Sequence, residues 1–183
     1  MNYDFNIACI NQCTEAEGPR KRLAIWFQGC DKRCEGCCNP ELHEIRPAHI
    51  ISIDALLGLI HDAKKEFGIE GVTFLGGEPT LQQNLPKLSL KIKELGLGVI
   101  LFTGNMAEEL DNELKFSVDM IIDGRFEINE PDNKRNLIGS LNQRMIHVTD
   151  RYRLDDAWFY TPRPKRIEVN ISDKMFITGD CLN

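Results

Sequence analysis

Residues 23–38, LAIWFQGCDKRCEGCC, join a short apolar run to four of the seven cysteines of the chain. The run LAIWF, residues 23–27, has the length and composition of a β-strand. Four cysteines follow it in a polar loop, at positions 30, 34, 37 and 38. Because α/β proteins place their sites at the carboxyl ends of strands, this junction indicates both the fold class and the place of a site.

Apolar runs and helical patterns alternate downstream of this junction. Strands are expected at residues 71–77, 99–104, 118–124 and 144–149, and helices at residues 52–67, 84–95 and 106–115. The strand runs are continuously apolar, which is typical of a parallel sheet covered on both faces. The units are too few to close an eight-stranded barrel. The sequence therefore predicts an α/β fold with a partial, open (β/α) barrel or a curved sheet.

A chain of 183 residues is long enough for one substantial core. Residues 1–149 are expected to form this core, and residues 150–183 a C-terminal extension that packs on it without being an independent domain. Within the extension, two short apolar runs flank Ser172-Asp173 in RIEVNISDKMFITG, residues 166–179. This pattern predicts a β-hairpin.

Charge and composition narrow the choice of partners and location. The net charge of −6 argues against nucleic acid or a membrane surface as a partner, because both favour a basic face. No apolar run reaches the roughly 18 residues of a membrane-spanning helix, and the first residues lack the pattern of a signal peptide. A cytoplasmic location is therefore expected, where thiols stay reduced.

The spacing of the cysteines indicates a metal or redox site. Cys30, Cys34 and Cys37 form C-x3-C-x2-C. A structural zinc site usually has two separated pairs, so zinc would need His43 or Cys38 as a fourth ligand. A ferredoxin cluster takes four thiolates, and three would leave one iron open to a substrate. The remaining cysteines, Cys9, Cys13 and Cys181, are interpreted as small buried hydrophobic residues.

A second motif indicates which kind of site the cysteines form. LGGEPT, residues 75–80, follows the second apolar strand. Together with the cysteine triad, it resembles the radical S-adenosylmethionine superfamily. The resemblance implies that Cys30, Cys34 and Cys37 carry a 4Fe-4S cluster and that S-adenosylmethionine is the second cofactor.

The same resemblance implies the cofactor-binding residues. Gly76, Gly77 and Glu78 would bind the methionine amino group, since glycines allow close backbone approach and a carboxylate accepts a charge-assisted bond. Gly36 and Cys38, which flank Cys37, complete the set. Cys38 stands where the family usually has an aromatic residue or histidine near the adenine, and it is interpreted as a small apolar lining residue.

Two downstream segments resemble one branch of the superfamily, the activating enzymes of anaerobic ribonucleotide reductase. They are VDMIIDGRFE, residues 118–127, and LIGSLNQRMI, residues 137–146. Arg144 and Thr103 are candidates for contacting the cofactor. The resemblance implies no catalytic residue beyond the cluster and cofactor.

The implied reaction is reductive cleavage of S-adenosylmethionine at the cluster. The resulting 5′-deoxyadenosyl radical would take a hydrogen atom from a glycine of the partner reductase, and a flavodoxin- or ferredoxin-type protein would supply the electron. Two alternatives remain open. One is a radical enzyme that acts directly on a small molecule or peptide, and the other is a non-catalytic iron–sulfur or zinc module.

Overall fold

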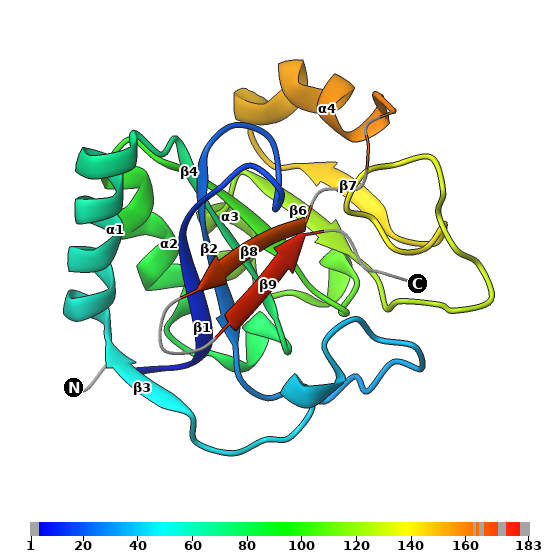
Figure 1. Cartoon of the computed structure of the whole chain (residues 1–183), viewed down its shortest axis with the longest axis horizontal. Helices are drawn as coiled ribbons and strands as arrows, with labels where there is room; N and C mark the ends of the chain where they lie inside the picture. Colours follow the sequence, from blue (N-terminus) through cyan, green and yellow to red (C-terminus); the bar gives the residue numbers. More distant parts are fainter. Residues whose placement is uncertain (1–3, 163, 165–166, 172–174, 180–183) are drawn as a thin grey trace.

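A computed structural model describes residues 4–162, 164, 167–171 and 175–179 (Figure 1). Its centre is a seven-stranded sheet of β1 (Asp4–Thr14), β2 (Arg22–Phe27), β3 (His49–Ser52), β4 (Gly71–Gly76), β5 (Gly98–Phe102), β6 (Met120–Asp123) and β7 (Arg144–His147). The helices are α1 (Ile53–Phe67), α2 (Leu85–Glu94), α3 (Asn112–Ser117) and α4 (Asp156–Tyr160). Short 3-10 helices are η1 (Pro40–Leu42), η2 (Pro79–Leu81), η3 (Ala107–Glu109) and η4 (Asp150–Asp155).

The strand order is β3-β1-β2-β4-β5-β6-β7, and the sheet does not close. Strands β2, β4, β5 and β6 are parallel, as the continuous apolar runs predict. The two edges differ from the prediction. Strand β7 pairs antiparallel with β6, while β1 and β3, which the sequence did not reveal, add antiparallel strands at the other edge. The open α/β architecture is confirmed, with a mixed rather than wholly parallel sheet.

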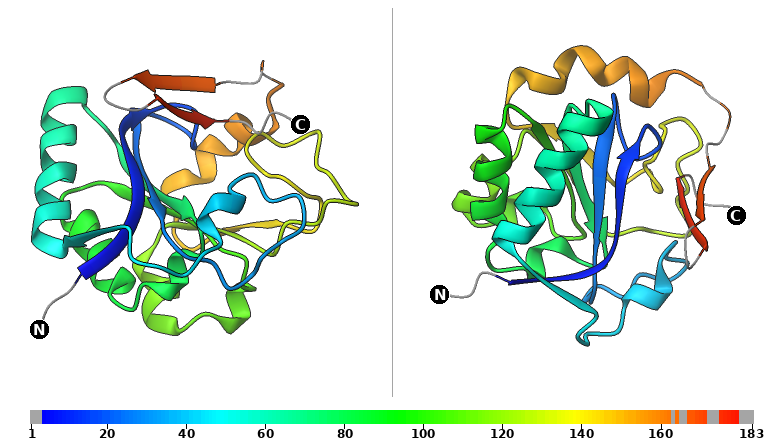
Figure 2. Two further views of the ribbon diagram at one scale, coloured as in Figure 1. Left: turned by 60° about the horizontal axis from the view of Figure 1, so that its bottom comes forward. Right: turned by 60° about the vertical axis from the view of Figure 1, so that its left-hand side comes forward.

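The two faces of the sheet are covered differently. Helices α1, α2 and α3 lie on one face (Figure 2). The antiparallel hairpin of β8 (Ile167–Ile171) and β9 (Met175–Gly179) lies over the other. This pairing confirms the predicted hairpin, although its turn at Ser172-Asp173 falls outside the described residues. Within the described part of the chain, no helix is long and apolar enough to cross a membrane.

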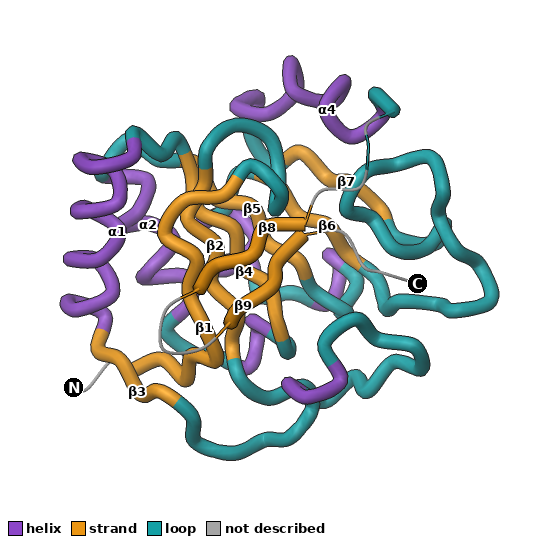
Figure 3. The backbone as a smooth tube through the Cα atoms, viewed as in Figure 1, coloured by secondary structure: helices purple, strands orange, loops and turns teal. Residues whose placement is uncertain are grey.

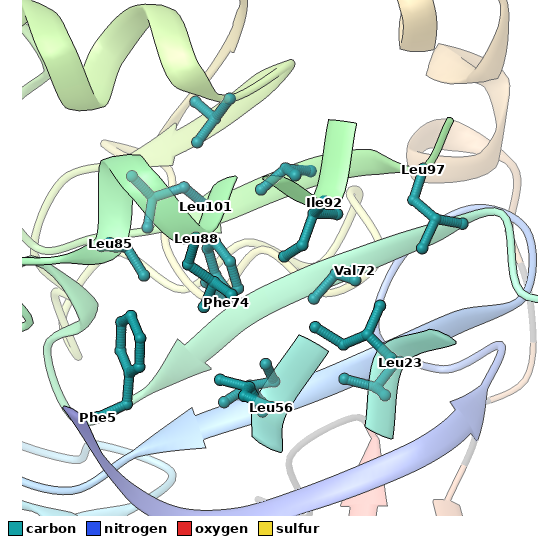
Figure 4. Close-up of a cluster of buried hydrophobic side chains, with 14 of the residues drawn as sticks. Phe5, Leu23, Leu56, Val72, Phe74, Leu85, Leu88, Ile92, Leu97 and Leu101 are labelled. Carbon is teal, nitrogen blue, oxygen red and sulfur yellow. The ribbon is translucent and has the colours of Figure 1, made fainter. Parts of the chain in front are cut away.

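The core fills the space between the sheet and helices α1 and α2 (Figure 4). Leu56 of α1 and Leu88 of α2 are fully buried against Phe74 of β4 and Leu101 of β5. Helix α1 begins as predicted at Ser52, whose hydroxyl accepts a hydrogen bond from Ala55 N–H at 3.3 Å. Burial of this apolar layer fixes the strands whose carboxyl ends form the site.

The predicted helix at residues 106–115 is wrong as a single element. Its first turn is η3, and the chain is extended at Leu110 and Asp111, with ψ of 141° and 140°, before α3 begins. The Glu109 carboxylate accepts a hydrogen bond from Met106 N–H at 2.8 Å, which closes the first turn on itself. This bond caps the start of η3, as a glutamate does at a helix N-terminus, so it does not account for the break at Leu110 and Asp111.

Arg22 and Tyr152 join the C-terminal segment to the sheet at the amino-terminal ends of the parallel strands. Arg22 is fully buried and donates to Thr73 Oγ1 at 2.6 Å, Val72 O at 2.8 Å and the Tyr152 hydroxyl at 2.9 Å. Burial lowers the pKa of the Arg22 guanidinium. Because Tyr152 is also buried, η4 packs against the strand starts, away from the cysteines.

Candidate functional site

Four loops meet at the carboxyl edge of the parallel strands (Figure 3). We name them the cysteine loop (residues 28–48), the β4 loop (77–84), the β5 loop (103–111) and the β6 loop (124–143). The cysteine loop and the β6 loop lie side by side (Figure 1). Because parallel strands bring such loops to one edge, the fold gathers motifs that are far apart in the sequence.

The three cysteines of the C-x3-C-x2-C motif are free thiols on the cysteine loop. Cys30 is buried, whereas Cys34 and Cys37 are half-buried. Cys30 Sγ accepts a hydrogen bond from Lys32 N–H, and Cys37 Sγ accepts one from Asn39 N–H, both at 3.4 Å. Burial raises the pKa of Cys37, the Asn39 N–H acts to lower it, and Cys34 and Cys30 raise it further. The thiols of Cys30 and Cys34 thus lie near enough to Cys37 to act on its pKa.

The fourth cysteine of the loop differs from its neighbours. Cys38 is exposed and disulfide-bonded. The interpretation of Cys38 as a small apolar lining residue of the cofactor site stays a prediction. Cys9 and Cys13 are half-buried free thiols on β1, and burial raises the pKa of both. Cys181 lies outside the described residues.

Gly77 holds the β4 loop against the start of the cysteine loop. Gly77 N–H donates to Phe27 O at 2.9 Å, and Glu78 N–H donates to Gly29 O at 2.8 Å. A Cβ atom on Gly77 would lie 2.1 Å from Gly29 O. Only glycine permits this approach, so the Gly-Gly-Glu segment and the cysteine motif are joined backbone to backbone.

Glu78 is buried and bonded to the β5 loop. Its Oε1 accepts from Thr80 N–H at 3.1 Å, from the Thr80 hydroxyl at 2.8 Å and from the Thr103 hydroxyl at 2.8 Å. Its Oε2 accepts from Gly104 N–H at 2.8 Å. A carboxylate oxygen has two lone pairs, so Oε2 keeps one for a further donor. Glu78 therefore ties the ends of β4 and β5 together while retaining some binding capacity.

Gly36 brings the cysteine loop against the β6 loop. It has a φ of +71°, and a Cβ atom there would lie 2.6 Å from Ile128 Cδ1 and 3.3 Å from the Phe126 ring. A larger residue would push these two side chains away. The structure thus gives Gly36 a role in packing the two loops together.

The two segments that resemble the activating enzymes are joined directly. Asp123 is fully buried and accepts from Arg144 Nε at 3.0 Å and from an Arg144 terminal nitrogen at 2.5 Å. Bonds from Arg144 to Asp123 and to Glu108 raise the pKa of the guanidinium. The Gln143 amide donates to Gly124 O at 3.1 Å. The bonds between Arg144 and Asp123 thus hold the two ends of the β6 loop together. The other candidate cofactor contact, Thr103, donates a hydrogen bond from its hydroxyl to Glu78.

A cleft of about 380 Å³ opens between these loops. Its lining comprises Lys32, Gly104, Asn105, Met106, Glu109, Arg125, Glu127 and Asn142. This volume is within the range of small-molecule sites. Sequence reasoning missed Lys32, Gly104 and Asn105. Gly104 and Asn105 could have been found from their position, because they closely follow the end of the buried strand β5.

The sequence of this chain is similar to those of known proteins. Residues 16–146 match the family described as a 4Fe-4S single cluster domain. The chain belongs to this family. The 4Fe-4S single cluster domain includes the cysteine loop and all four of the parallel strands.

Individual relatives agree with this assignment. The anaerobic ribonucleoside-triphosphate reductase-activating protein of Enterobacteria phage T4 is 33% identical over 156 residues, which cover 82% of this chain and 96% of that protein. The pyruvate formate-lyase-activating enzyme of Staphylococcus aureus (strain USA300) is 37% identical over 91 residues, 48% of this chain and 36% of that enzyme. The crystal structure of QueE from Escherichia coli has the same fold, with a TM-score of 0.50, 16% identity and coverage of 69% and 72% of the two chains.

These findings confirm the radical S-adenosylmethionine assignment and its resemblance to the activating proteins. The chain is an enzyme of this superfamily, with a 4Fe-4S cluster and S-adenosylmethionine as cofactors. A non-catalytic module is therefore set aside.

The residues present fit the cluster. Three free thiols on one loop supply the donor set, and backbone N–H groups already bond to two of the sulfurs, as is common around iron–sulfur clusters. The described residues contain no group of three histidine, cysteine or acidic side chains already set to hold a metal ion.

Proposed function

We propose that this protein activates an anaerobic ribonucleoside-triphosphate reductase by generating a glycyl radical on it. The match to nearly the whole length of the phage T4 activating protein carries this proposal. A second line of support is the direct bonding between the two branch-specific segments, through Asp123 and Arg144.

The proposed roles of the site residues follow the order of the loops. Cys30, Cys34 and Cys37 hold the cluster. Gly76, Gly77 and Glu78 bind the methionine amino group of S-adenosylmethionine, and Gly36 and Cys38 complete the cofactor site beside the third cysteine. When bound, the two cofactors supply one-electron cleavage of S-adenosylmethionine and hydrogen-atom abstraction. A flavodoxin- or ferredoxin-type protein is the proposed electron donor, residues 1–149 form the proposed core, and residues 150–183 its extension.

Exposed apolar side chains on three of the four loops support a protein partner. Ile45 of the cysteine loop is 66% exposed, Ile128 and Leu141 of the β6 loop are 46% and 56% exposed, and Met106 is 37% exposed. Apolar groups gathered at one edge of a soluble protein are typical of an interaction surface. A reductase docked there would cover these side chains and exclude water from the cleft.

The test uses the reconstituted protein together with the reductase and S-adenosylmethionine, under strong reductant and without oxygen. We expect slow cleavage of S-adenosylmethionine by the protein alone, because the open edge admits water. We expect faster cleavage with the reductase, which should acquire a doublet glycyl signal in electron paramagnetic resonance. Fast cleavage without a protein partner, with a small metabolite consumed in step, would establish the direct-substrate alternative instead.

Substitution of Glu78 tests the proposed cofactor site. Glu78→Ala removes the acceptor for the ammonium and releases the β5 loop. We expect S-adenosylmethionine binding to weaken by roughly ten- to a hundredfold, as for loss of a charged hydrogen bond. Iron content should be unchanged, because Glu78 contacts none of the three cysteines. Calorimetric titration measures the affinity for S-adenosylmethionine, and iron analysis measures the iron content.

Glu113→Ala is the matched control, because Glu113 is an exposed carboxylate in the first turn of α3. The Glu113→Ala protein should bind S-adenosylmethionine with the same affinity as the unaltered protein. Unchanged affinity in Glu78→Ala would remove Glu78 from the cofactor site.

A further inference from the structure

Lys32 has no role in the function proposed so far. It lies between two of the cluster cysteines, yet its side chain leaves the cysteine loop and lies along the β5 loop. A Cβ atom on Gly104 would be 2.8 Å from Lys32 Cγ. The Lys32 side chain is only 12% exposed and lines the cleft.

The ammonium of Lys32 has unused donors. Lysine is seldom buried to this degree unless its charge is paired. Lys32 Nζ contacts Asp31 Oδ2 at 3.0 Å, and the Asp31 side chain is 46% exposed. An ammonium has three donors, and this contact occupies one. The other two remain for a ligand in the cleft.

An acceptor lies near the same position of Gly104. The Cβ position on Gly104 that approaches Lys32 is 3.5 Å from Glu78 Oε2. The side chain of Lys32, whose ammonium has free donors, and the Glu78 carboxylate, which has a free lone pair, therefore both lie close to Gly104. An α-amino acid carries the complementary pair, an ammonium and a carboxylate on one carbon. A ligand lying over Gly104 can meet both groups at once.

Asn142 gives independent evidence for a ligand in the cleft. Its amide nitrogen donates to Arg125 O at 2.8 Å, which fixes the orientation of the side chain. Its Oδ1 is buried and has no hydrogen-bond partner among the described residues. Buried acceptors are rarely left unpaired in native proteins, so a donor supplied by a ligand is expected there.

The charges that line the cleft also favour a zwitterion. Lys32 and Arg125 contribute two positive charges, and Glu109 and Glu127 contribute two negative ones. Such a lining does not attract a simple anion or a simple cation. A ligand that carries both signs satisfies it without leaving an unpaired charge.

We infer that Lys32 binds the α-carboxylate of an amino-acid moiety in this cleft and so determines its specificity for S-adenosylmethionine over nucleosides that lack the amino-acid part. This inference rests on the proposed function, because it assigns one more contact at the same site. Free methionine has the same α-amino-acid chemistry and is the other source of such a moiety.

The test is calorimetric titration of the anaerobically reconstituted protein with three probes. They are S-adenosylhomocysteine, 5′-methylthioadenosine, which lacks the amino-acid part, and free methionine. We expect Lys32→Gln to weaken S-adenosylhomocysteine binding by about tenfold or more. Binding of 5′-methylthioadenosine should change by less than about twofold. Arg33→Gln, an exposed neighbour on the same loop, should bind all three probes as the unaltered protein does.

The outcomes separate the inference from the function on which it rests. If Lys32→Gln also weakens methionine binding, the free amino acid is a second ligand of this site, and if the unaltered protein does not bind methionine, the site serves the cofactor alone. Equal weakening of both adenosyl probes, or no weakening, overturns the role of Lys32 and leaves the proposed function intact. If the unaltered protein binds neither adenosyl probe, the proposed function fails as well.

Discussion

Substitution of Cys30, Cys34 or Cys37 with alanine should abolish the cluster. The unaltered protein, reconstituted without oxygen, should hold about four irons per chain. Each of the three cysteines is a free thiol on one loop. Loss of one of three ligands leaves two irons of a cluster without protein ligands. We therefore expect near-complete loss of bound iron, measured by iron analysis and by the cluster absorbance.

Cys38→Ala is the matched control for this series. Cys38 lies next to Cys37 but is exposed and disulfide-bonded, so its substitution should leave iron content unchanged. Retention of iron in Cys37→Ala with loss in Cys38→Ala would mean that the ligand spacing is C-x3-C-x3-C. Tight stoichiometric zinc without iron uptake would contradict the cluster assignment altogether.

Buried strands and helices were accessible to prediction because their signals are local. Helix α1 has a capping serine and apolar residues at helical spacing, and the structure places its ends within one residue of the prediction. The four parallel strands read as continuous apolar runs. Strand β1 was missed because its residues are mixed in polarity and do not form a continuous apolar run. The break between η3 and α3 was missed because the whole segment has the composition of a helix, although Asp111, a residue type favoured at helix N-caps, directly precedes α3.

The motifs of the site were predictable, but their mutual arrangement was not. The cysteine triad and LGGEPT are visible in the sequence, whereas the bonds from Glu78 to Thr103 and Gly104 depend on the β5 loop, which carries no motif. The same holds for Lys32, whose type and position give no sign that its side chain lies along Gly104. Contacts between loops follow from strand order, and strand order is a property of the whole sheet.

Gly77→Ala should lower the free energy of unfolding strongly, and this is the second largest effect that we expect. The added Cβ would lie 2.1 Å from Gly29 O and 2.7 Å from Gly29 C, and both atoms belong to the backbone, so no side-chain rotation relieves the contact. The β4 loop must move away, which breaks the bonds from Gly77 N–H to Phe27 O and from Glu78 N–H to Gly29 O. Overpacking and two lost buried hydrogen bonds together predict a loss of about 3 kcal/mol or more in the free energy of unfolding. Urea denaturation of the reduced, metal-free protein measures it.

Gly58→Ala separates this steric argument from a general sensitivity to glycine replacement. Gly58 is exposed in the middle of α1, and a Cβ atom there meets nothing within 4 Å. The substitution should raise the free energy of unfolding by about 0.4–1 kcal/mol, since alanine loses less backbone entropy on folding. Gly77→Ala should in addition lower iron content, because Gly29 directly precedes Cys30 and must shift with the loop. A Gly77→Ala protein as stable as the unaltered one, with full iron content, would show that the β4 loop and the cysteine loop are not held together at this point, and the backbone link between the two motifs would have to be abandoned.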